Sequence, residues 1–510
     1  MTGLSSNTAL DDIQGLILRG YNFQYIRYII LKIQNPLGAQ KFCAALLPES
    51  QSPLSITTAR PWPGGIKPEY CLNLGISYLG LLQLIGQDNC SSVAKASPKL
   101  FNIYPPGATD PNNTELIGDT DESAPANWWS RSGGWLLTEP PTATGSELHL
   151  QLTLYVNVPE DRDKYYDLLL GMIPVIAGQP AVVPAFFKDS DPIIVAEDPD
   201  YVHFGYKDSL SQPRVAEVPW NKPANRLKNG ISTIDDRPVV PAYHFAISLD
   251  KNVPYNAHPL LLNGSFAAFR LLYQDVEAFN TFINASSNPE LTAAKMCGRW
   301  FDGTPLEVSP DGEDKSLKDF DYTNFNYITA TANQKGPGTE DNLGQRCPYA
   351  AHIRRANPRD DAYVKGNEPV NGKPQNAVQH RVMRRASPYG PVYQPGETPG
   401  IQRGLVGLFI GADLFNQFQF IMSQWISAGS FRSPDTPNNS GIDPLFGPQP
   451  SDPDPNHQNL EYYVGQAGNN PPYEDQPGLT RFIRTDGSLY VFLPGINALR
   501  YISDGKVPLI

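Results

Sequence analysis

Three short polar segments stand out because each groups side chains that can hold a metal or move a proton within a largely apolar setting. They are residues 203–213 (HFGYKDSLSQP), 347–359 (CPYAAHIRRANPR) and 380–391 (HRVMRRASPYGP). His352 offers an imidazole for a metal, Asp208 a carboxylate for proton transfer, and Arg384 a guanidinium for developing negative charge. Taken singly, they also fit a core histidine, a turn residue and a surface charge, so the argument depends on their occurring together.

Other catalytic signatures are missing from the sequence. The chain has seven histidines, without an HExxH pair or an HxH cluster, which argues against a zinc hydrolase. It has no GxGxxG after a strand, no GxxxxGK[ST] and no GxSxG, so the usual dinucleotide, nucleoside-triphosphate and serine-hydrolase sites are not expected.

The composition is that of a globular protein, with 510 residues of which 40% are hydrophobic and 11% aromatic. The net charge of −12 would repel a phosphate backbone, so nucleic acid is not an expected partner, whereas a neutral or cationic small substrate is compatible. Five scattered cysteines predict free thiols in a reducing compartment. The first twelve residues resemble no export signal and the apolar runs are short, so we expect a cytoplasmic protein without a membrane partner. No particular oligomeric state is predicted.

Strands and helices are both expected in each half of the chain. Alternating leucines predict a strand over 148–158 with one buried and one wetter face. Apolar and β-branched runs predict strands over 25–33, 265–272, 405–410 and 488–493. Helices are expected over 275–283 and 413–426, the second with Leu414, Phe418, Ile421 and Trp425 on its apolar face.

The order of these elements favours an α+β fold with antiparallel sheets over a regular βαβ fold. A soft boundary falls near 227–241. Long polar stretches rich in proline and glycine cover 130–145, 302–345, 359–379 and 430–476, and loops of this length usually gate a site or decorate a surface.

The three polar segments resemble landmarks of the dye-decolorizing peroxidases. Residues 205–209 (GYKDS) resemble the family's GxxDG signature and are followed by its SQP; residues 347–359 resemble its proximal CPFAAHIRKxNPR segment; residues 384–391 resemble its RRGxPYGP segment. Further similar stretches occur in the family's order: 12–15 (DIQG), 263–270 (NGSFAAFR), 298–306 and 490–499. Together they span nearly the whole chain.

The resemblance implies two ferredoxin-like halves, residues 1–235 and 236–510, with antiparallel sheets and peripheral helices, as in the dimeric α+β barrel-like superfamily. It also implies one haem b per chain, and oxidation of dye-like, phenolic or other aromatic donors with hydrogen peroxide. Two alternatives stay open: a haem-binding or storage protein with little turnover, and a related enzyme that releases iron from the porphyrin.

The resemblance also implies roles for single residues. His352 is the expected iron ligand, Asp208 the proton shuttle and Arg384 the charge-stabilising group, with Arg385 as a lesser candidate. The expected cofactor-binding residues are Arg359 toward the propionates, with Arg354 and Arg381 as weaker candidates, together with Ser209, Gln212 and Asp413. Asp413 is expected to hold the His352 ring or, alternatively, to cap the helix over 413–426.

Two positions depart from the family's pattern. Ser209 stands where the family has a glycine, and a serine with positive φ would be strained. Gly407 stands where the family usually has phenylalanine, so we expect a roomier distal pocket. Tyr389 is the preferred candidate for a surface electron relay, because Trp300 and Trp425 are better explained by core packing.

Overall fold

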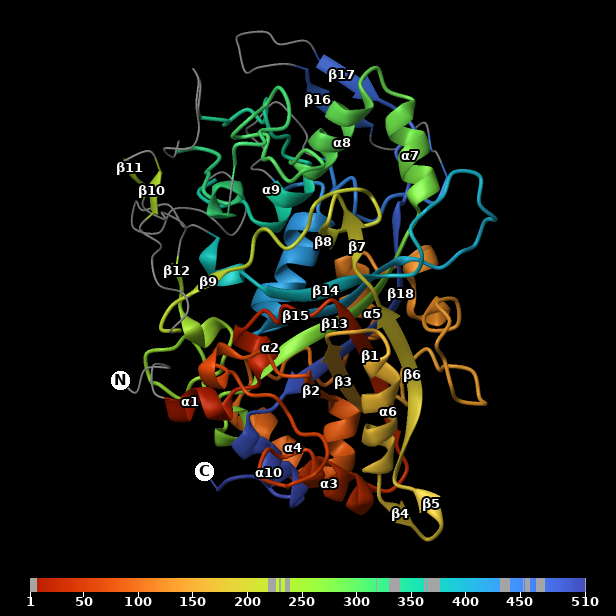
Figure 1. The fold of residues 1–510 in the computed structure, drawn as a ribbon, viewed down its shortest axis with the longest axis vertical. Helices are drawn as coiled ribbons and strands as arrows, with labels where there is room; N and C mark the ends of the chain where they lie inside the picture. The colour runs from red at the N-terminus through yellow and green to blue at the C-terminus, as the bar shows by residue number, and fades with distance from the viewer. Residues whose placement is uncertain are drawn as a thin grey trace.

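The computed structural model of the chain describes residues 7–218, 226–228, 231–233, 239–317, 319–329, 340–361, 364, 377–431, 441–452, 454, 459–464 and 473–509. An antiparallel sheet of eight strands runs through the middle of the molecule (Figure 1). Its strands are β1 (Tyr25–Ile33), β2 (Tyr70–Ser77), β3 (Leu150–Val156), β6 (Val182–Ser190), β13 (Ser265–Gln274), β14 (Met383–Tyr389), β15 (Gly404–Gly411) and β18 (Ile483–Leu493).

The sheet is built from two sets of four strands with the same topology. The order is β14-β15-β13-β18-β2-β3-β1-β6, so in each set the first strand in sequence lies between the third and the fourth. This is the strand order of a ferredoxin-like half, and β18 joins β2 where Val491 pairs with Ser77. The predicted α+β fold with two ferredoxin-like halves is confirmed. The proposed division at residue 235 lies outside the described residues and stays a prediction.

The two edge strands of the sheet approach each other. The Ser190 hydroxyl at the end of β6 donates to the Pro388 carbonyl of β14 at 2.7 Å, and the Asp191 N–H donates to the same oxygen at 3.2 Å. Tyr28 of β1 and Phe269 of β13 lie on strands that are not neighbours, yet their ring centroids are 5.9 Å apart. The sheet therefore curls into a barrel whose interior is filled by aromatic rings.

This closure explains why the prediction of a wetter face for β3 was wrong. Every residue from Leu150 to Val156 is buried. The polar side chains of the strand are satisfied locally, since the Gln151 amide donates to the Thr153 hydroxyl at 2.9 Å and to the Leu152 carbonyl at 2.8 Å. The alternation in the sequence therefore identifies which residues share a face of β3, but it does not show whether that face is exposed.

Helices and short hairpins surround the barrel. In the view of Figure 1, α3, α4, α6 and α10 lie in the lower half of the molecule and α7, α8 and α9 in the upper half. The helices are α1 (Asn7–Asp12), α2 (Gly15–Leu18), α3 (Pro36–Ala45), α4 (Tyr78–Ala96), α5 (Pro111–Ile117), α6 (Asp161–Gly171), α7 (Val276–Asn284), α8 (Pro289–Cys297), α9 (His352–Ala356) and α10 (Ile496–Ser503). The short strands are β4 (Val175–Ile176), β5 (Gln179–Pro180), β7 (Ile193–Val195), β8 (Asp198–Tyr201), β9 (Arg214–Val215), β10 (Arg226–Lys228), β11 (Ile231–Thr233), β12 (Val239–Val240), β16 (Leu460–Tyr463) and β17 (Tyr473–Gln476).

Both predicted helices are present. α7 follows the capping residue Asp275, whose carboxylate accepts from the Ala278 N–H at 2.9 Å. The segment predicted over 413–426 forms two π-helical stretches, η8 (Phe415–Gln419) and η9 (Ile421–Ile426), and its four predicted apolar side chains are all buried.

Within the described ranges, no helix has the length and hydropathy that crossing a bilayer requires. The cytoplasmic location stays a prediction.

Candidate active site

A cavity of about 300 Å³ lies where the three polar segments meet. Its polar wall contains seven of the residues singled out from the sequence: Asp208, Ser209, Gln212, His352, Arg359, Arg381 and Arg384. Its apolar wall comes largely from β15 and the two π-helical stretches, with Leu405, Phe409, Phe418, Ile421 and Met422. Segments separated by almost 180 residues in sequence therefore share one mainly apolar cavity.

His352 is oriented by a buried carboxylate. It is the first residue of α9, and its Nδ1 lies 2.7 Å from Oδ2 of the fully buried Asp443. The other carboxylate oxygen of Asp443 accepts from the Leu445 and Phe446 N–H groups at 2.9 Å each. With Nδ1 engaged by Asp443, Nε2 is the ring nitrogen that remains for a metal.

The prediction that Asp413 holds the His352 ring is corrected by this geometry. The Asp413 carboxylate accepts from the Asn416 N–H at 3.0 Å and from the Asn416 side-chain amide at 2.6 Å. These are the contacts of an N-cap at the start of η8, which was the alternative for this residue. Asp413 also does not appear in the cavity wall.

Asp208 lies on a tightly folded loop after β8. The Asp208 N–H donates to the Asp200 carbonyl at 2.7 Å, and the Lys207 N–H donates to the Phe301 carbonyl at 2.8 Å. The loop is anchored in the core by Phe204, whose ring stacks on Phe279 of α7 at 4.5 Å. The main chain around Asp208 is therefore fixed from both sides.

Arg384 comes from β14, the edge strand, and its guanidinium donates to the Asp208 carboxylate. The Gln212 amide pairs with the main chain of Arg384, since its Nε2 donates to the Arg384 carbonyl at 3.0 Å and its Oε1 accepts the Arg384 N–H at 3.3 Å. Gln212 thus fastens the Asp208 loop to the strand of Arg384. Arg385 points the other way and donates to the Leu16 carbonyl at 2.9 Å, as strand alternation requires.

Two buried arginines lie on the cavity wall. Arg359 donates to the Thr323 and Phe325 carbonyls at 2.8 Å, and Arg299 donates to the Gly303 and Tyr322 carbonyls at 2.9 and 2.7 Å. Burial lowers the pKa of both guanidiniums, that of Arg359 to about 10. Arg299 was missed by the sequence argument, although it lies within the landmark over 298–306.

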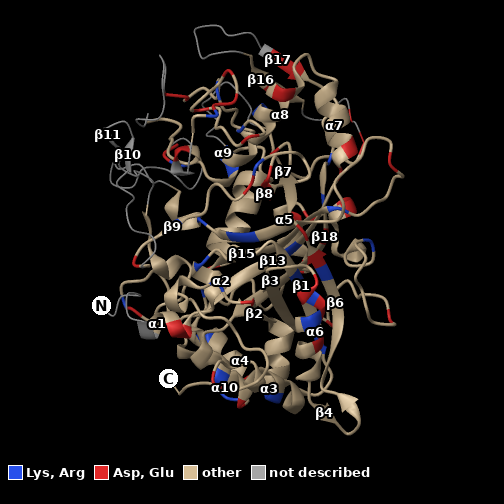
Figure 2. Cartoon of the chain, in the orientation of Figure 1, with Lys and Arg blue, Asp and Glu red and all other residues tan. Residues whose placement is uncertain are grey.

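The charge of the cavity wall is opposite to that of the chain. Lys and Arg occur beside Asp and Glu across much of the molecule, for example along α6 and α10 (Figure 2), and the net charge is −12. Among the described residues, the cavity wall holds one carboxylate, from Asp208, against five basic side chains: Lys207, Arg299, Arg359, Arg381 and Arg384. Such a wall fits a ligand that carries acidic groups on an apolar body.

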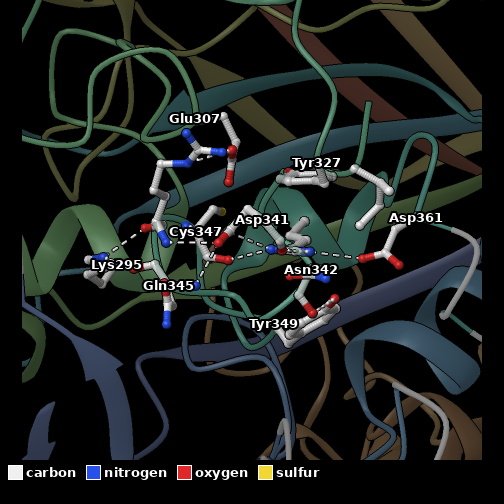
Figure 3. Close-up of polar contacts among 12 residues, drawn as sticks. Lys295, Glu307, Tyr327, Asp341, Asn342, Gln345, Cys347, Tyr349 and Asp361 are labelled. Atoms are coloured by element: carbon white, nitrogen blue, oxygen red, sulfur yellow. Dashed lines mark hydrogen bonds and ion pairs between the residues drawn. The ribbon is translucent and has the colours of Figure 1, made fainter. Parts of the chain in front are cut away.

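Arg354, a weaker candidate for the propionates, is not on the cavity wall, and this expectation was wrong. Its guanidinium donates to Asp341 and Asp361 at 2.9 Å each and lies over the Tyr327 and Tyr349 rings. Figure 3 shows these four residues gathered in one polar cluster. The cluster holds the loop before α9.

The same cluster organises that loop. One oxygen of Asp341 accepts from the Gln345 and Arg346 N–H groups at 2.7 and 3.1 Å, and the other accepts from the Cys347 N–H at 3.0 Å. Lys295 of α8 donates to the Gln345 and Arg346 carbonyls at 2.8 Å (Figure 3), and burial lowers the pKa of Lys295 to about 8. The loop that leads into His352 is thus tied to α8.

The two departures from the family's pattern have different outcomes. Ser209 has a φ of +61°, so the strained backbone expected for a serine at this position is confirmed. Gly407 does not leave a roomier pocket: a Cβ there would lie 2.2 Å from the Arg385 carbonyl oxygen and 2.4 Å from the Ala386 Cα. Strand β14 fills that space, and Phe409 supplies an aromatic wall.

The candidate relay residues are all buried. The Trp300 indole donates to the Ser309 carbonyl at 2.8 Å, and Trp425 packs against the ring of Phe420. The Tyr389 ring lies 4.9 Å from the Lys188 ammonium, and its hydroxyl has no hydrogen-bond partner among the described residues.

Comparison with known proteins agrees with this geometry. No family model matches the chain. A dye-decolorizing peroxidase of Mycena epipterygia is 27% identical over 416 residues, which are 78% of this chain and 68% of the relative. One of Auricularia auricula-judae is 24% identical over 96% of this chain and 86% of the relative.

Solved structures support the same relationship. The crystal structure of a DyP-type peroxidase from Auricularia auricula-judae superposes with a TM-score of 0.71, covering 97% of this chain and 99% of that one at 22% identity. A dye-decolorizing peroxidase in complex with 2,6-dimethoxyphenol gives a TM-score of 0.72 with the same coverage and 23% identity. In its sequence relatives and in its fold, the chain is thus similar to the dye-decolorizing peroxidases.

Proposed function

We propose that the chain is a haem-dependent peroxidase that oxidises phenolic, dye-like or other aromatic donors with hydrogen peroxide, using one haem b per chain. The observation that carries this proposal is the meeting of three groups in one cavity: the His352 ring held by Asp443, the Asp208–Arg384 pair, and the buried guanidiniums of Arg299 and Arg359.

The residues of the cavity fit a haem. His352 would ligate the iron through Nε2, because Nδ1 is held by Asp443. Arg359 and Arg299 would hold the propionates, since both guanidiniums are buried on the cavity wall and a carboxylate would give them charged hydrogen bonds. When bound, the haem supplies the iron at which peroxide is cleaved and the electrons that the cleavage consumes.

Cleavage of peroxide between its two oxygens requires one proton to move from the inner to the outer oxygen. The Asp208 carboxylate is the group that accepts and returns this proton. Arg384 keeps the Asp208 carboxylate in place and donates to negative charge that develops on the departing oxygen. Gln212 maintains the distance between the two groups, because it bonds to the main chain of Arg384.

The donor class follows from the family and from the cavity. A relative with the same fold has been solved with 2,6-dimethoxyphenol, which is a small electron-rich phenol. We propose the same class here, with Tyr389 as the candidate relay for donors too bulky to enter. Tyr389→Phe should then slow the oxidation of a bulky dye and leave the oxidation of a small phenol unchanged.

The test of the proposed function is an optical spectrum of the haem-loaded protein before and after one equivalent of peroxide, followed by stopped-flow rates. Asp208→Ala and Arg384→Ala should bind haem but react with peroxide about 10²–10⁴-fold more slowly. Arg385→Ala is the matched control, because it removes the neighbouring guanidinium from the other face of β14. Rates within a few-fold of wild type for both cavity variants would refute the role of the pair. Little reaction of the wild type with peroxide would favour a haem-binding or storage protein, and release of iron would favour the third alternative.

A further inference from the structure

The helix that carries His352 is too short to fix its own direction. α9 runs from His352 to Ala356, and its N-cap Ala351 makes no side-chain capping bond. A single helical turn is unstable in isolation, because nucleation costs more than one turn of hydrogen bonds returns. The orientation of His352 therefore depends on what holds the other side chains of α9.

Two consecutive, fully buried arginines hold this helix on different sides. Arg354 reaches into the polar cluster around Asp341 and Asp361 (Figure 3), toward the loop that precedes the helix. Arg355 reaches instead toward the segment that carries Asp443. Because Arg355 follows His352 by three residues, the two side chains lie on the same side of the helical turn.

Arg355 binds main-chain carbonyls of two segments at once. Its Nη1 donates to the Trp425 carbonyl and, at 3.0 Å, to the Ala428 carbonyl, at the C-terminal end of η9. Its Nη2 donates to the Gly441 carbonyl, two residues before Asp443. The planar guanidinium can reach several acceptors in fixed directions, which a flexible ammonium group cannot.

Asp443 is fastened to the same place. Its N–H donates to the Ile426 carbonyl, the last residue of η9, at 3.0 Å. The ring of His352 then meets the Asp443 carboxylate at 2.7 Å. α9 and the Asp443 segment are thus joined by two links, the His352–Asp443 hydrogen bond and the Arg355 contacts with the carbonyls.

We propose that Arg355 is a positioning residue that sets the hydrogen bond between the Asp443 carboxylate and the His352 ring. Without the Arg355 contacts, the Gly441–Asp443 segment would keep its bond to η9, and the His352–Asp443 hydrogen bond would have to hold it against α9 without the second link. The inference rests on the proposed function only in that His352 is taken to ligate the haem iron. The carboxylate makes the ring a stronger donor to iron, so a looser bond would weaken haem binding and raise the reduction potential.

The first test needs no haem. Hydrogen exchange of the Leu445 and Phe446 amides reports on the Asp443 carboxylate that accepts them. Arg355→Met should accelerate their exchange at least about tenfold, and Arg355→Lys should give a smaller increase. Arg385→Met is the matched control, because Arg385 also donates to a main-chain carbonyl and burial also lowers its pKa to about 10. Equal exchange in wild type, Arg355→Lys and Arg355→Met would overturn the proposal.

The second test separates positioning from a general structural role. In the haem-loaded protein, Arg355→Met should raise the reduction potential and weaken haem binding about tenfold, as expected for the loss of an outer-shell contact. In an Asp443→Asn background, Arg355→Met should change the reduction potential and the haem affinity little further, because the His352–Asp443 hydrogen bond through which Arg355 acts is already altered. A full additional shift would overturn the proposal. Should Arg355→Met fail to fold, the same comparison is made with Arg355→Lys. Absence of haem in the wild type would refute the proposed function, while the exchange measurement would still decide the role of Arg355.

Discussion

The replacement of Asp443 by asparagine distinguishes the observed partner of His352 from the one that the sequence indicated. The Asp443 carboxylate accepts from the His352 Nδ1–H at 2.7 Å on one oxygen and from two N–H groups on the other. An asparagine can keep its oxygen toward the two N–H groups, but it then presents an NH₂ group to Nδ1. This favours the tautomer of the His352 ring with the proton on Nε2. A metal needs that nitrogen unprotonated, so the substitution works against metal binding.

The size of the effect follows from the bond that is lost. A hydrogen bond to a charged group contributes about 1.5–3 kcal/mol. Since about 1.4 kcal/mol corresponds to a factor of ten, the affinity for haem should fall about 10- to 150-fold. Asp413→Asn is the control: asparagine caps helices as well as aspartate does, and the Asp413 carboxylate bonds to Asn416 and not to His352, so no change is expected.

Titration of haem into the haem-free protein, followed by Soret absorbance, measures both variants on the same scale. Thermal unfolding of the haem-free forms shows whether either substitution damages the fold. The reasoning would be refuted if Asp413→Asn weakened haem binding tenfold or more while Asp443→Asn bound haem like the wild type.

Three further predictions concern stability. Ser209→Gly should leave the thermal midpoint equal or higher, because relief of the left-handed φ of +61°, about 1–2 kcal/mol, outweighs the added chain entropy of about 0.5–1 kcal/mol; a clear drop in calorimetry would contradict this. Gly407→Ala should destabilise by about 1–3 kcal/mol in urea unfolding, because its Cβ would press on the main chain of β14, and an unchanged midpoint would reopen the idea of an empty pocket. Burial and the nearby Asp341 raise the pKa of Glu307 well above 4.5, so its stabilising contribution is complete below pH 4.5 and is lost as the pH rises. Glu307→Gln should therefore become more stable relative to wild type between pH 5 and pH 8 in thermal unfolding, and parallel pH curves would argue against a protonated Glu307.

The sequence predicts those features that local patterns determine. The strand expected over 25–33 has the same limits as β1, because β-branched, aromatic and aliphatic residues extend over the whole segment. Asp275 starts α7 because its carboxylate satisfies an N–H three residues on. The residues of the three polar segments meet in one cavity, and this was expected from their resemblance to the family's landmarks, not from their spacing.

Features that depend on contacts across the fold escaped prediction. Asp443 lies 91 residues after His352 in a polar stretch without periodicity, and nothing in its neighbourhood marks it as different from the capping residue Asp413. A glycine at position 407 fits either a pocket that lacks an aromatic wall or a neighbouring strand packed too closely to admit a side chain. The position of β14 decides between the two. The burial of β3 follows from barrel closure, which a single strand does not encode.

The charge of the cavity connects these observations with the need for a cofactor. A net charge of −12 would attract cations to the surface, yet basic side chains predominate on the cavity wall. Burial there lowers the pKa of both Arg299 and Arg359, and both guanidiniums donate to main-chain carbonyls. A ligand with carboxylates on an apolar body would offset the cost of this burial through charged hydrogen bonds. His352 and Arg359 lie on and just after the five-residue helix α9, so a ligand held by both would stabilise the segment that forms its site.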